Sequence, residues 1–345
     1  MGFFKTFGEN PSGKRLTTVE SSVNYKNKAF HNLSKTRMIV DNFSLVRNLW
    51  KFLNKPANTA PPKPLPSLKT DLKTINSDKP VIVWFGHSSY FIRINEKNIL
   101  VDPVFSGNAS PFSFGAKSFA GTDVYETADF PVIDLMILTH DHYDHLDSQT
   151  VIELKKQVKH IVTSLGVASH LLYWGFDEQC ITELDWWEHK KVIDGLEITA
   201  VPARHFSGRS LVRNKTLWSS FIITSSPYKI FAGGDSGYDS HFKTIGEKYG
   251  PFDIAVLEAG QYNEQWPDIH MMPEDTVQAA IDLRAKILLP VHWAKFALSL
   301  HAWDEPVKRV LEKAKALQVK VTTPKIGEPV ILDSSYPGSP WWMDL

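Results

Sequence analysis

One short segment of the sequence, Thr139 to Asp147, gathers residue types that bind metal ions. Three histidines and two aspartates fall within six positions, as His140, Asp141, His142, Asp144 and His145. Imidazole and carboxylate are ligands of zinc and related divalent ions, and two adjacent ions activate water for hydrolysis. In such a turn, His140 and His142 can point to one metal ion, while Asp144 and His145 reach a second ion a few ångströms away. We therefore expect this loop to begin a site for two metal ions.

Two ions need more donors than one loop supplies, and three candidates occupy equivalent places elsewhere in the chain. Each directly follows an apolar run that is predicted to be a strand: His205 after Leu196–Val201, Asp235 after Lys229–Ala232, and His292 after Ile287–Val291. Catalytic groups collect on loops at the ends of strands. We expect these three side chains to converge with the histidine loop on one rim of a sheet and to complete the ligand set.

The elements that must position these residues are strands that alternate with helices from about Val81 onward. Strands are predicted at Val81–Phe85, Tyr90–Ile94, Ile99–Val101, Val132–Leu138, His160–Thr163, Leu196–Val201, Trp218–Thr224, Lys229–Ala232, Asp253–Leu257 and Lys286–Val291. The first three are expected to form an antiparallel meander. A helix is predicted at Pro273–Ala285, which opens with a proline and two acidic residues. This mixture predicts a layered α/β domain over residues 81–345.

The first 80 residues have a different texture, with scattered charges and few periodic apolar positions. The stretch Pro56–Pro66 is proline-rich and predicts an extended linker or a wrapping arm. Before it, a short amphipathic helix is predicted by the helical spacing of Phe43, Val46, Leu49, Trp50 and Leu53. Its apolar face packs on the main domain in the favoured interpretation and lies on a membrane surface in the alternative one.

Composition narrows the classes of function. Lysine plus arginine and aspartate plus glutamate both number 38, so the chain has no net charge with which to hold a nucleic acid. The single cysteine, Cys180, permits neither an internal disulfide nor a cysteine-rich metal site, so histidine and carboxylate must hold any metal. Because the sequence has no long apolar run and no secretory pattern, we expect a cytoplasmic protein, with peripheral contact at the inner membrane face as a further expectation. The sequence indicates no oligomeric state.

The segment Thr139–Asp147 resembles the HxHxDH signature of the metallo-β-lactamase superfamily, and the later His, Asp and His occur in the order of that superfamily. This resemblance implies a four-layer αββα sandwich with the metal ions at one edge. Other stretches are similar to the family of N-acylphosphatidylethanolamine-hydrolysing phospholipases D over about residues 81–306, namely Trp84–Ser88, Asp102–Pro103, Leu184–Trp187, Leu217–Ser220 and Val291–Leu298.

The superfamily resemblance implies a role for each ligand candidate. One zinc ion would be held by His140, His142 and His205, the other by Asp144, His145 and His292, and Asp235 would bridge the two ions. Histidine at position 142 favours zinc hydrolysis over the di-iron redox branch of the superfamily, and sites rich in imidazole suit zinc. The expected cofactor is therefore two Zn²⁺ ions per chain.

The phospholipase resemblance also implies contacts with the substrate. His270 matches a family histidine that contacts the substrate phosphate, and Tyr143 is a second candidate for substrate contact. Either Asp144 or Asp235 is expected to relay the proton. The chain departs from the phospholipases at Leu257–Tyr262, where Glu258 makes the stretch more acidic than the family pattern.

The reaction predicted from these resemblances is hydrolysis of a phosphodiester in an N-acylphosphatidylethanolamine-type phospholipid, which gives an N-acylethanolamine and phosphatidic acid. Three alternatives remain open. The first is a phosphodiesterase that acts on a small soluble substrate such as a cyclic nucleotide, and the second is a lactone or ester hydrolase of the same fold. The third is a metal-binding scaffold without activity, against which an intact set of seven ligands argues.

Overall fold

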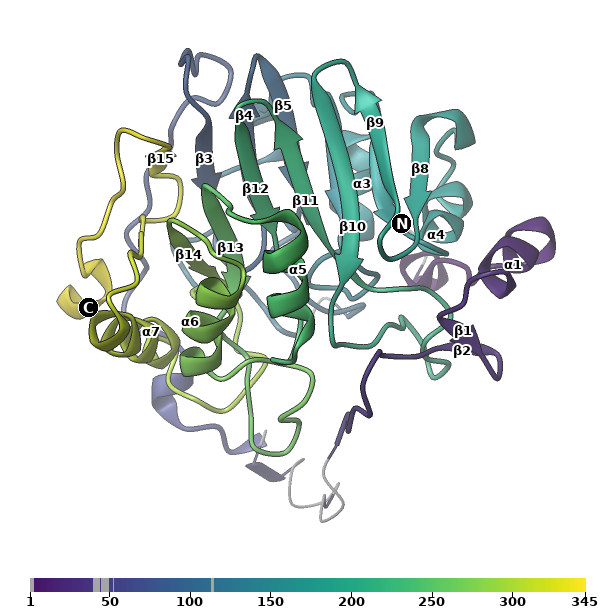
Figure 1. Ribbon diagram of the computed structural model, residues 1–345. Coiled ribbons are helices and arrows are strands. Elements are labelled where there is room, and N and C mark those ends of the chain that lie inside the picture. The colour runs from purple at the N-terminus through teal and green to yellow at the C-terminus, as the bar shows by residue number, and fades with distance from the viewer. Residues whose placement is uncertain (1–2, 40–43, 45–49, 52, 113–114) are drawn as a thin grey trace.

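Two mixed β-sheets lie face to face at the centre of the structure, and helices cover the outer face of each (Figure 1). The computed structural model describes residues 3–39, 44, 50–51, 53–112 and 115–345. The amino-terminal and carboxy-terminal ends lie on opposite sides of the molecule. In the described ranges, no helix has the length and apolar character needed to cross a membrane.

The first sheet has seven strands in the order β15-β3-β4-β5-β6-β7-β8. Its strands are β3 (Val81–Trp84), β4 (Tyr90–Ile94), β5 (Lys97–Val101), β6 (Leu135–Leu138), β7 (Ile161–Ser164), β8 (Ile181–Leu184) and β15 (Pro329–Ile331). Strands β3 to β5 form the predicted antiparallel meander, and β5 to β8 are parallel. Strands β8 and β15 were not predicted.

The second sheet has six strands in the order β14-β13-β12-β11-β10-β9. Its strands are β9 (His189–Ile193), β10 (Leu196–Pro202), β11 (Ser219–Ser225), β12 (Tyr228–Ala232), β13 (Ile254–Glu258) and β14 (Leu288–Val291). Strands β9 to β12 are antiparallel and β12 to β14 are parallel. Strand β9 was missed because it is a largely exposed edge strand with two lysines, which lacks an apolar pattern.

Side chains of the central strands alternate between two cores, as the pleat of a strand requires. In β3, Ile82 and Trp84 belong to the core between the sheets, whereas Val81 and Val83 belong to the core under the first helix layer. Because both faces of β3 are covered, its sequence is a continuous apolar run rather than an alternating one. This arrangement buries both sheets and confirms the predicted α/β sandwich.

The helices form the two outer layers. On the first sheet lie α3 (Ser148–Leu154) and α4 (Ala168–Tyr173), and on the second sheet lie α5 (His241–Tyr249), α6 (Pro273–Asp282) and α7 (Glu305–Leu317). Short 3₁₀ helices occur at Phe3–Phe7, Ala57–Thr59, Thr127–Asp129, Glu178–Cys180 and Trp341–Asp344. The predicted helix at Pro273–Ala285 is therefore α6, which ends earlier than predicted because Arg284 adopts a φ of 59°.

The described residues of the first 80 follow the surface of the sandwich. They include α1 (Gly13–Glu20) and a small hairpin of β1 (Tyr25–Lys26) and β2 (Ala29–Phe30), none of which was predicted. Arg15 of α1 forms an ion pair with Glu183, and Arg37 forms another with Asp268. The amphipathic helix predicted at Phe43–Leu53 falls largely outside the described residues.

Candidate metal centre

The loops that carry the candidate ligands leave the two sheets at one common edge. Strands β3 and β6 run in the same direction in the first sheet, as do β10, β12, β13 and β14 in the second. The carboxyl ends of strands that run together meet at one edge of a sheet, where ligand sites are usual. The residues that follow these ends are His87, the segment His140–His145, His205, Asp235 and His292.

One group of four donors can surround a single metal ion. It consists of His140, His142, His205 and Asp235, with donor atoms that all lie within 4.8 Å of one another. The Nε2 atoms of His140 and His205 lie 3.0 and 3.2 Å from Nδ1 of His142. They lie 3.9 and 3.7 Å from Oδ2 of Asp235. A tetrahedral zinc ion with bonds of about 2.1 Å would place its ligand atoms roughly 3.4 Å apart, so these spacings fit one ion.

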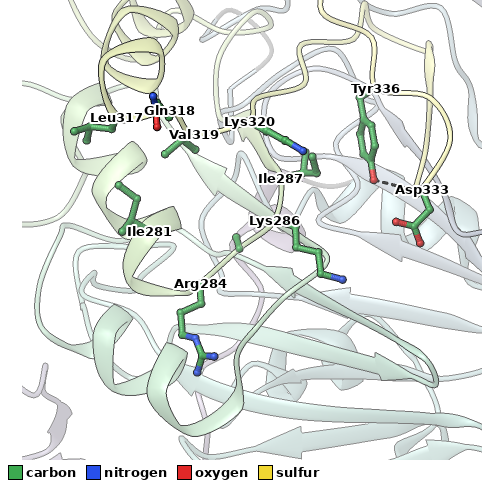
Figure 2. A pocket seen from close by; sticks show the side chains of 11 residues that line it. Ile281, Arg284, Lys286, Ile287, Leu317, Gln318, Val319, Lys320, Asp333 and Tyr336 are labelled. Carbon is green, nitrogen blue, oxygen red and sulfur yellow. Dashed lines mark hydrogen bonds between the residues drawn. The ribbon is translucent and has the colours of Figure 1, made fainter.

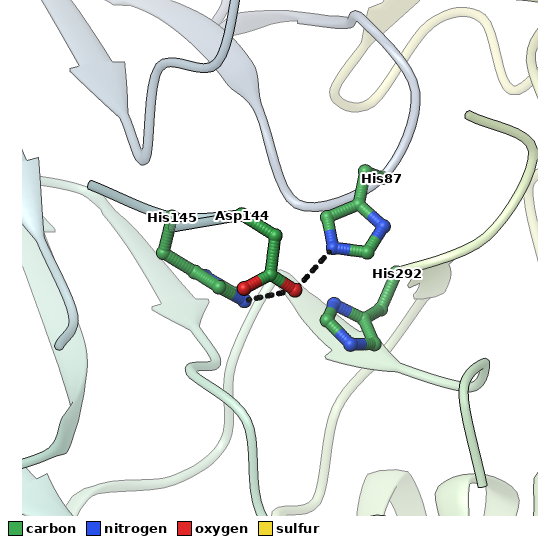
Figure 3. Close-up of side chains that lie close together, drawn as sticks. All are labelled: His87, Asp144, His145 and His292. Carbon is green, nitrogen blue, oxygen red and sulfur yellow. Dashed lines mark hydrogen bonds and ion pairs between the residues drawn. The ribbon is translucent and has the colours of Figure 1, made fainter. Parts of the chain in front are cut away.

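A second group of four donors lies next to the first and consists of His87, Asp144, His145 and His292 (Figure 3). The Nε2 atom of His145 lies 3.8 Å from Oδ2 of Asp144 and 3.2 Å from Oδ2 of Asp235. Asp235 therefore faces both groups, as expected of a bridging carboxylate. His87 was not predicted as a site residue, although it lies directly after β3 in the Trp84–Ser88 stretch.

Unpaired donor atoms in this region fit a bound cation. The Nε2 atoms of His145 and His292 and Oδ1 of Asp235 are buried and make no hydrogen bond within the part of the chain that the structure describes. Two of these atoms, His145 Nε2 and Asp235 Oδ1, have only ion-pair contacts, the nearest at 3.2 Å. A buried polar atom without a partner costs about 1–3 kcal/mol. Two divalent ions would satisfy these atoms together, so the residues present fit a pair of metal ions.

Other residues fix the orientation of the donor rings. The carboxylate of Asp102 lies 2.8 Å from Nδ1 of His145, and it also accepts hydrogen bonds from the backbone and the hydroxyl of Thr139. The backbone oxygen of Ile269 lies 2.8 Å from Nδ1 of His205. Since each contact occupies Nδ1, the Nε2 atom of each ring is left for a metal.

The first 80 residues also contribute to this support. The side chain of Asn32 donates to the backbone oxygen of His205 at 2.8 Å and accepts from its backbone nitrogen at 3.1 Å. The backbone oxygen of Thr6 accepts from the guanidinium of Arg209, which in turn donates to the backbone oxygens of Asp141 and Leu146 in the histidine loop. The amino-terminal segment thus helps to hold two of the loops that carry ligands.

The protonation states of the donors differ from ring to ring. Burial opposes a charge on His145, but attraction to Asp235 and Asp144 outweighs burial and holds the pKa of His145 well above the ordinary histidine value. Burial holds the pKa of His140, His205 and His292 well below the ordinary histidine value, so these rings are neutral at pH 7. Burial alone would raise the pKa of Asp235, but the charge on the neighbouring His145 outweighs burial and holds that pKa well below its usual range. The carboxylate is therefore anionic and attracts a cation.

A cavity of about 250 Å³ opens in front of both donor groups. Its polar lining includes His142, Asp144, Asp235, His270 and His292 from the candidate site, together with Gln261 and Arg213. Its apolar lining consists of Met38, Ile39, Phe206, Trp266, Ile269 and Leu298. A ligand in this cavity would contact both candidate metal ligands and apolar side chains.

His270 lines this cavity and is backed by a buried carboxylate. Its Nδ1 atom lies 2.6 Å from Oε2 of Glu258, the last residue of β13. Burial opposes a charge on His270, but attraction to Glu258 outweighs burial and raises the pKa of His270 to about 9. The Glu258–His270 pair therefore presents a proton-carrying imidazole to the cavity at neutral pH.

Tyr143 is not placed as the sequence suggested. Among the described residues that line the cavity Tyr143 does not occur, and its hydroxyl donates to the backbone oxygen of Arg209 at 2.5 Å. The guanidinium carbon of Arg209 lies 4.1 Å from the centre of the Tyr143 ring. Tyr143 thus packs on Arg209 instead of lining this cavity, and its contact with a substrate stays a prediction.

A larger cavity lies at the other end of β14 and differs in character (Figure 2). It has a volume of about 660 Å³ and is lined by Arg284, Lys286, Lys320, Asp333 and Tyr336 among others. Its described lining contains no histidine and only one carboxylate, so it offers no set of metal ligands. The smaller cavity is therefore the candidate active site.

Substituting Asp235→Asn should lower the metal content of the purified protein from two ions per chain to one or fewer. An amide lacks the charge and the second anionic oxygen with which the carboxylate faces both donor groups, and loss of such a ligand weakens metal binding by more than the 10- to 100-fold typical of outer partners. Elemental analysis after dialysis measures the content. Asp134→Asn, at the opposite end of β6, is the control and should bind as much metal as the wild-type protein. If the wild-type protein itself holds one ion or fewer per chain after zinc supplementation, the two-metal site is contradicted.

Substituting Tyr143→Phe should leave KM for bis(p-nitrophenyl) phosphate within about twofold and lower the free energy of unfolding by about 1 kcal/mol. The removed hydroxyl donates to a backbone oxygen and does not face the cavity. Tyr173→Phe, on an exposed side chain of α4, should change neither quantity. A tenfold rise in KM without loss of stability would instead assign Tyr143 to substrate binding.

Comparison with known proteins agrees with this fold and site. Residues 97–293 match the family model described as the beta-lactamase superfamily domain. An uncharacterized protein of Mycobacterium tuberculosis is 38% identical over 328 residues, which cover 94% of this chain and 88% of that protein. N-acyl-phosphatidylethanolamine-hydrolyzing phospholipase D 1 of Caenorhabditis elegans is 30% identical over 260 residues, which cover 67% of this chain and 73% of that protein.

A solved structure has a similar fold. Igni18, a metallo hydrolase from the archaeon Ignicoccus hospitalis, superposes with a TM-score of 0.57 at 22% identity, covering 74% of this chain and all of that one. At this identity the similarity concerns the fold alone. With the family model, the phospholipase relative and the sandwich in agreement, the chain belongs to the metallo-β-lactamase superfamily.

Proposed function

We propose that this superfamily member is a dizinc phosphodiesterase of phospholipids. Its substrate would be an N-acylphosphatidylethanolamine-type lipid, and its products an N-acylethanolamine and phosphatidic acid. One feature of the cavity carries this proposal: apolar side chains that include Phe206 and Trp266 line it together with predicted metal ligands, Arg213 and His270. A phospholipid combines the same two characters, an anionic phosphodiester and acyl chains.

The donor set supports zinc as the metal. Five imidazoles are available from the predicted ligands His140, His142, His145, His205 and His292, with carboxylates from Asp144 and Asp235. Nitrogen-rich sets of this kind suit zinc, whereas magnesium and calcium prefer oxygen. A bound pair of zinc ions would activate a water molecule and neutralise negative charge on the phosphate.

The chain's own residues would bind the phosphate and move the proton. Hydrolysis breaks the bond between phosphorus and the ethanolamine oxygen; water gives its hydroxyl to phosphorus and a proton to the leaving oxygen. His270 can donate a hydrogen bond to a phosphoryl oxygen, and Arg213 can attract the anionic group from the rim. Asp144 and Asp235 both line the cavity, and either carboxylate is placed to carry the proton.

The relatives support the substrate class. The Caenorhabditis elegans relative is named for hydrolysis of N-acyl-phosphatidylethanolamine, and its similarity spans most of that enzyme's length. The seven predicted ligands and His270 all fall within residues 97–293, which match the superfamily model. We therefore extend the reaction of that relative to this chain.

We also propose that the cavity mouth contacts a membrane surface. Leu211 is fully exposed two residues before Arg213, which lines the cavity, and Val212 between them is about half exposed. Leu53 is 76% exposed, and the nearby Lys55 donates to Ala297, the neighbour of the lining residue Leu298. Exposed apolar side chains with adjacent cations are typical of surfaces that lie at a lipid interface.

The substrate class is tested by comparing three probes: N-acylphosphatidylethanolamine in detergent micelles, a cyclic nucleotide and a p-nitrophenyl ester. Wild-type kcat/KM should be highest for the phospholipid. His270→Ala should keep both metal ions and lose about 100- to 1,000-fold in turnover of phosphodiesters, because a donor to the phosphoryl oxygen is removed. The carboxylic ester should lose less.

His189→Ala, on the exposed edge strand β9, is the matched control and should behave as wild type. Cleavage of the cyclic nucleotide with no cleavage of the phospholipid would replace the proposed substrate by a soluble phosphodiester. A higher kcat/KM for the p-nitrophenyl ester than for either phosphodiester would instead indicate a carboxylic ester hydrolase.

The membrane contact is tested with the double variant Leu53→Ser, Leu211→Ser, because deletion of the amino-terminal segment would also remove Asn32 from the site. Binding to vesicles of phosphatidylglycerol and phosphatidylcholine should weaken roughly tenfold in a sedimentation assay, since less apolar area enters the interface. The control variant Ile281→Ser, Leu317→Ser changes side chains that are 40% exposed near the larger cavity and should bind as wild type. Equal binding by both variants would exclude this surface.

A further inference from the structure

A buried carboxylate stands directly behind His270. The side chain of Glu258 is 1% exposed, and its Oε2 atom lies 2.6 Å from Nδ1 of His270. Its other oxygen accepts hydrogen bonds from the backbone nitrogens of Ser236 at 2.7 Å and Met271 at 3.3 Å. Both oxygens of Glu258 are thus held by fixed donors, and the carboxylate cannot turn away from the imidazole.

This contact determines which edge of the imidazole faces the cavity. The two nitrogens lie on opposite edges of the ring, and Nδ1 points into the protein toward Glu258. The side chain of His270 lines the cavity and is 13% exposed, and Nε2 makes no hydrogen bond to any described residue. Nε2 is therefore the nitrogen left to face a ligand in the cavity.

We propose that Glu258 is a positioning residue for phosphoryl recognition: it holds the His270 ring so that Nε2 faces the phosphoryl group of a phosphodiester in the cavity. This inference rests on the proposed function for the substrate class, but it assigns a role to a residue outside the seven predicted ligands. The pairing of a carboxylate with an imidazole that contacts the reacting group is a common way to orient a catalytic histidine.

The location of Glu258 links this role to specificity. It is the last residue of β13, at the start of the loop that leads to the cavity. The same loop supplies Gln261, which lines the cavity and hydrogen-bonds the backbone oxygen of Phe296. Glu258 therefore influences the substrate-facing lining of the cavity rather than the loops that carry the metal ligands. We expect its loss to slow the hydrolysis of phosphodiesters more than that of carboxylic esters.

A direct metal contact is the competing role for Glu258. Together with Asp235, His270 and His292 it forms a third group whose donor atoms lie within 4.8 Å of one another. Both of its oxygens are already engaged by Ser236, Met271 and His270, however, and a ligand role would require these contacts to break. Metal content separates the two roles, because a positioning residue can be changed without losing an ion.

The experiment is a double-mutant cycle on the metal-loaded full chain, with wild type, Glu258→Gln, His270→Ala and the double variant. In glutamine, the amide nitrogen would face either Nδ1 of His270 or the backbone nitrogen of Ser236, so the pair is disrupted at nearly constant volume. Glu258→Gln should keep the wild-type metal content and lose about 10- to 100-fold in kcat/KM for bis(p-nitrophenyl) phosphate, as outer partners of an imidazole do. In the His270→Ala background the same change should cost less than twofold, since Glu258 acts through His270.

Two further readouts complete the test. First, the rate of p-nitrophenyl acetate hydrolysis should change less than threefold in Glu258→Gln. Second, Glu258→Gln should weaken the affinity for inorganic phosphate, measured by calorimetry, about tenfold when His270 is present and not in the His270→Ala background. If Glu258→Gln fails to fold, Glu258→Asp withdraws the carboxylate by one methylene and gives the same comparison. Gln278→Glu, on the outer helix α6, is a control of equal chemical size and should leave all values unchanged.

The outcomes separate the inference from the proposed function. Equal losses from Glu258→Gln in both backgrounds would overturn the positioning role, and loss of a metal ion would make Glu258 a ligand. A wild-type enzyme that cleaves no phosphodiester would overturn the proposed function, whereas the phosphate-binding cycle would still decide whether Glu258 acts through His270.

Discussion

The structure depends on one electrostatic constraint, the concentration of buried imidazoles and carboxylates where the two sheets end together. Donor atoms of His145, His292 and Asp235 are buried without hydrogen-bond partners in the described chain. Such atoms destabilise a fold unless a cation binds them. Placing the ligands on separate strand ends brings them together only when both sheets are formed, so metal binding and closure of the sandwich stabilise each other.

The ligands could be predicted from the sequence because each directly follows an apolar run that forms a strand, and parallel strand ends share an edge. The partners of these ligands could not be predicted in this way. Asn32 contacts His205 across 173 positions, and Glu258 contacts His270 from a different element. Only tertiary packing creates these contacts, and no local pattern of residues indicates them.

Errors in the predicted elements have similar causes. Strand β9 exposes most of its residues, so its sequence lacks the apolar signal on which strand prediction depends. Tyr143 lies between two site residues, yet the turn directs its side chain to Arg209, because adjacent residues of an extended turn point to opposite sides. Most of the main-chain framework was predicted correctly, and the candidate ligands that directly follow its strands lie together in the structure. Prediction failed where a side chain's direction depends on a partner distant in sequence.

The support that the amino-terminal segment gives to the ligand loops has a consequence during synthesis on the ribosome. Thr6 and Asn32 emerge first, but their partners Arg209 and His205 are made much later, at separations of 203 and 173 residues. His292 is later still. A nascent chain therefore exposes the histidine loop before its binding partners exist, and the high contact order of the site makes its assembly a late, slow event. The candidate metal centre can therefore assemble only after His292 has been made.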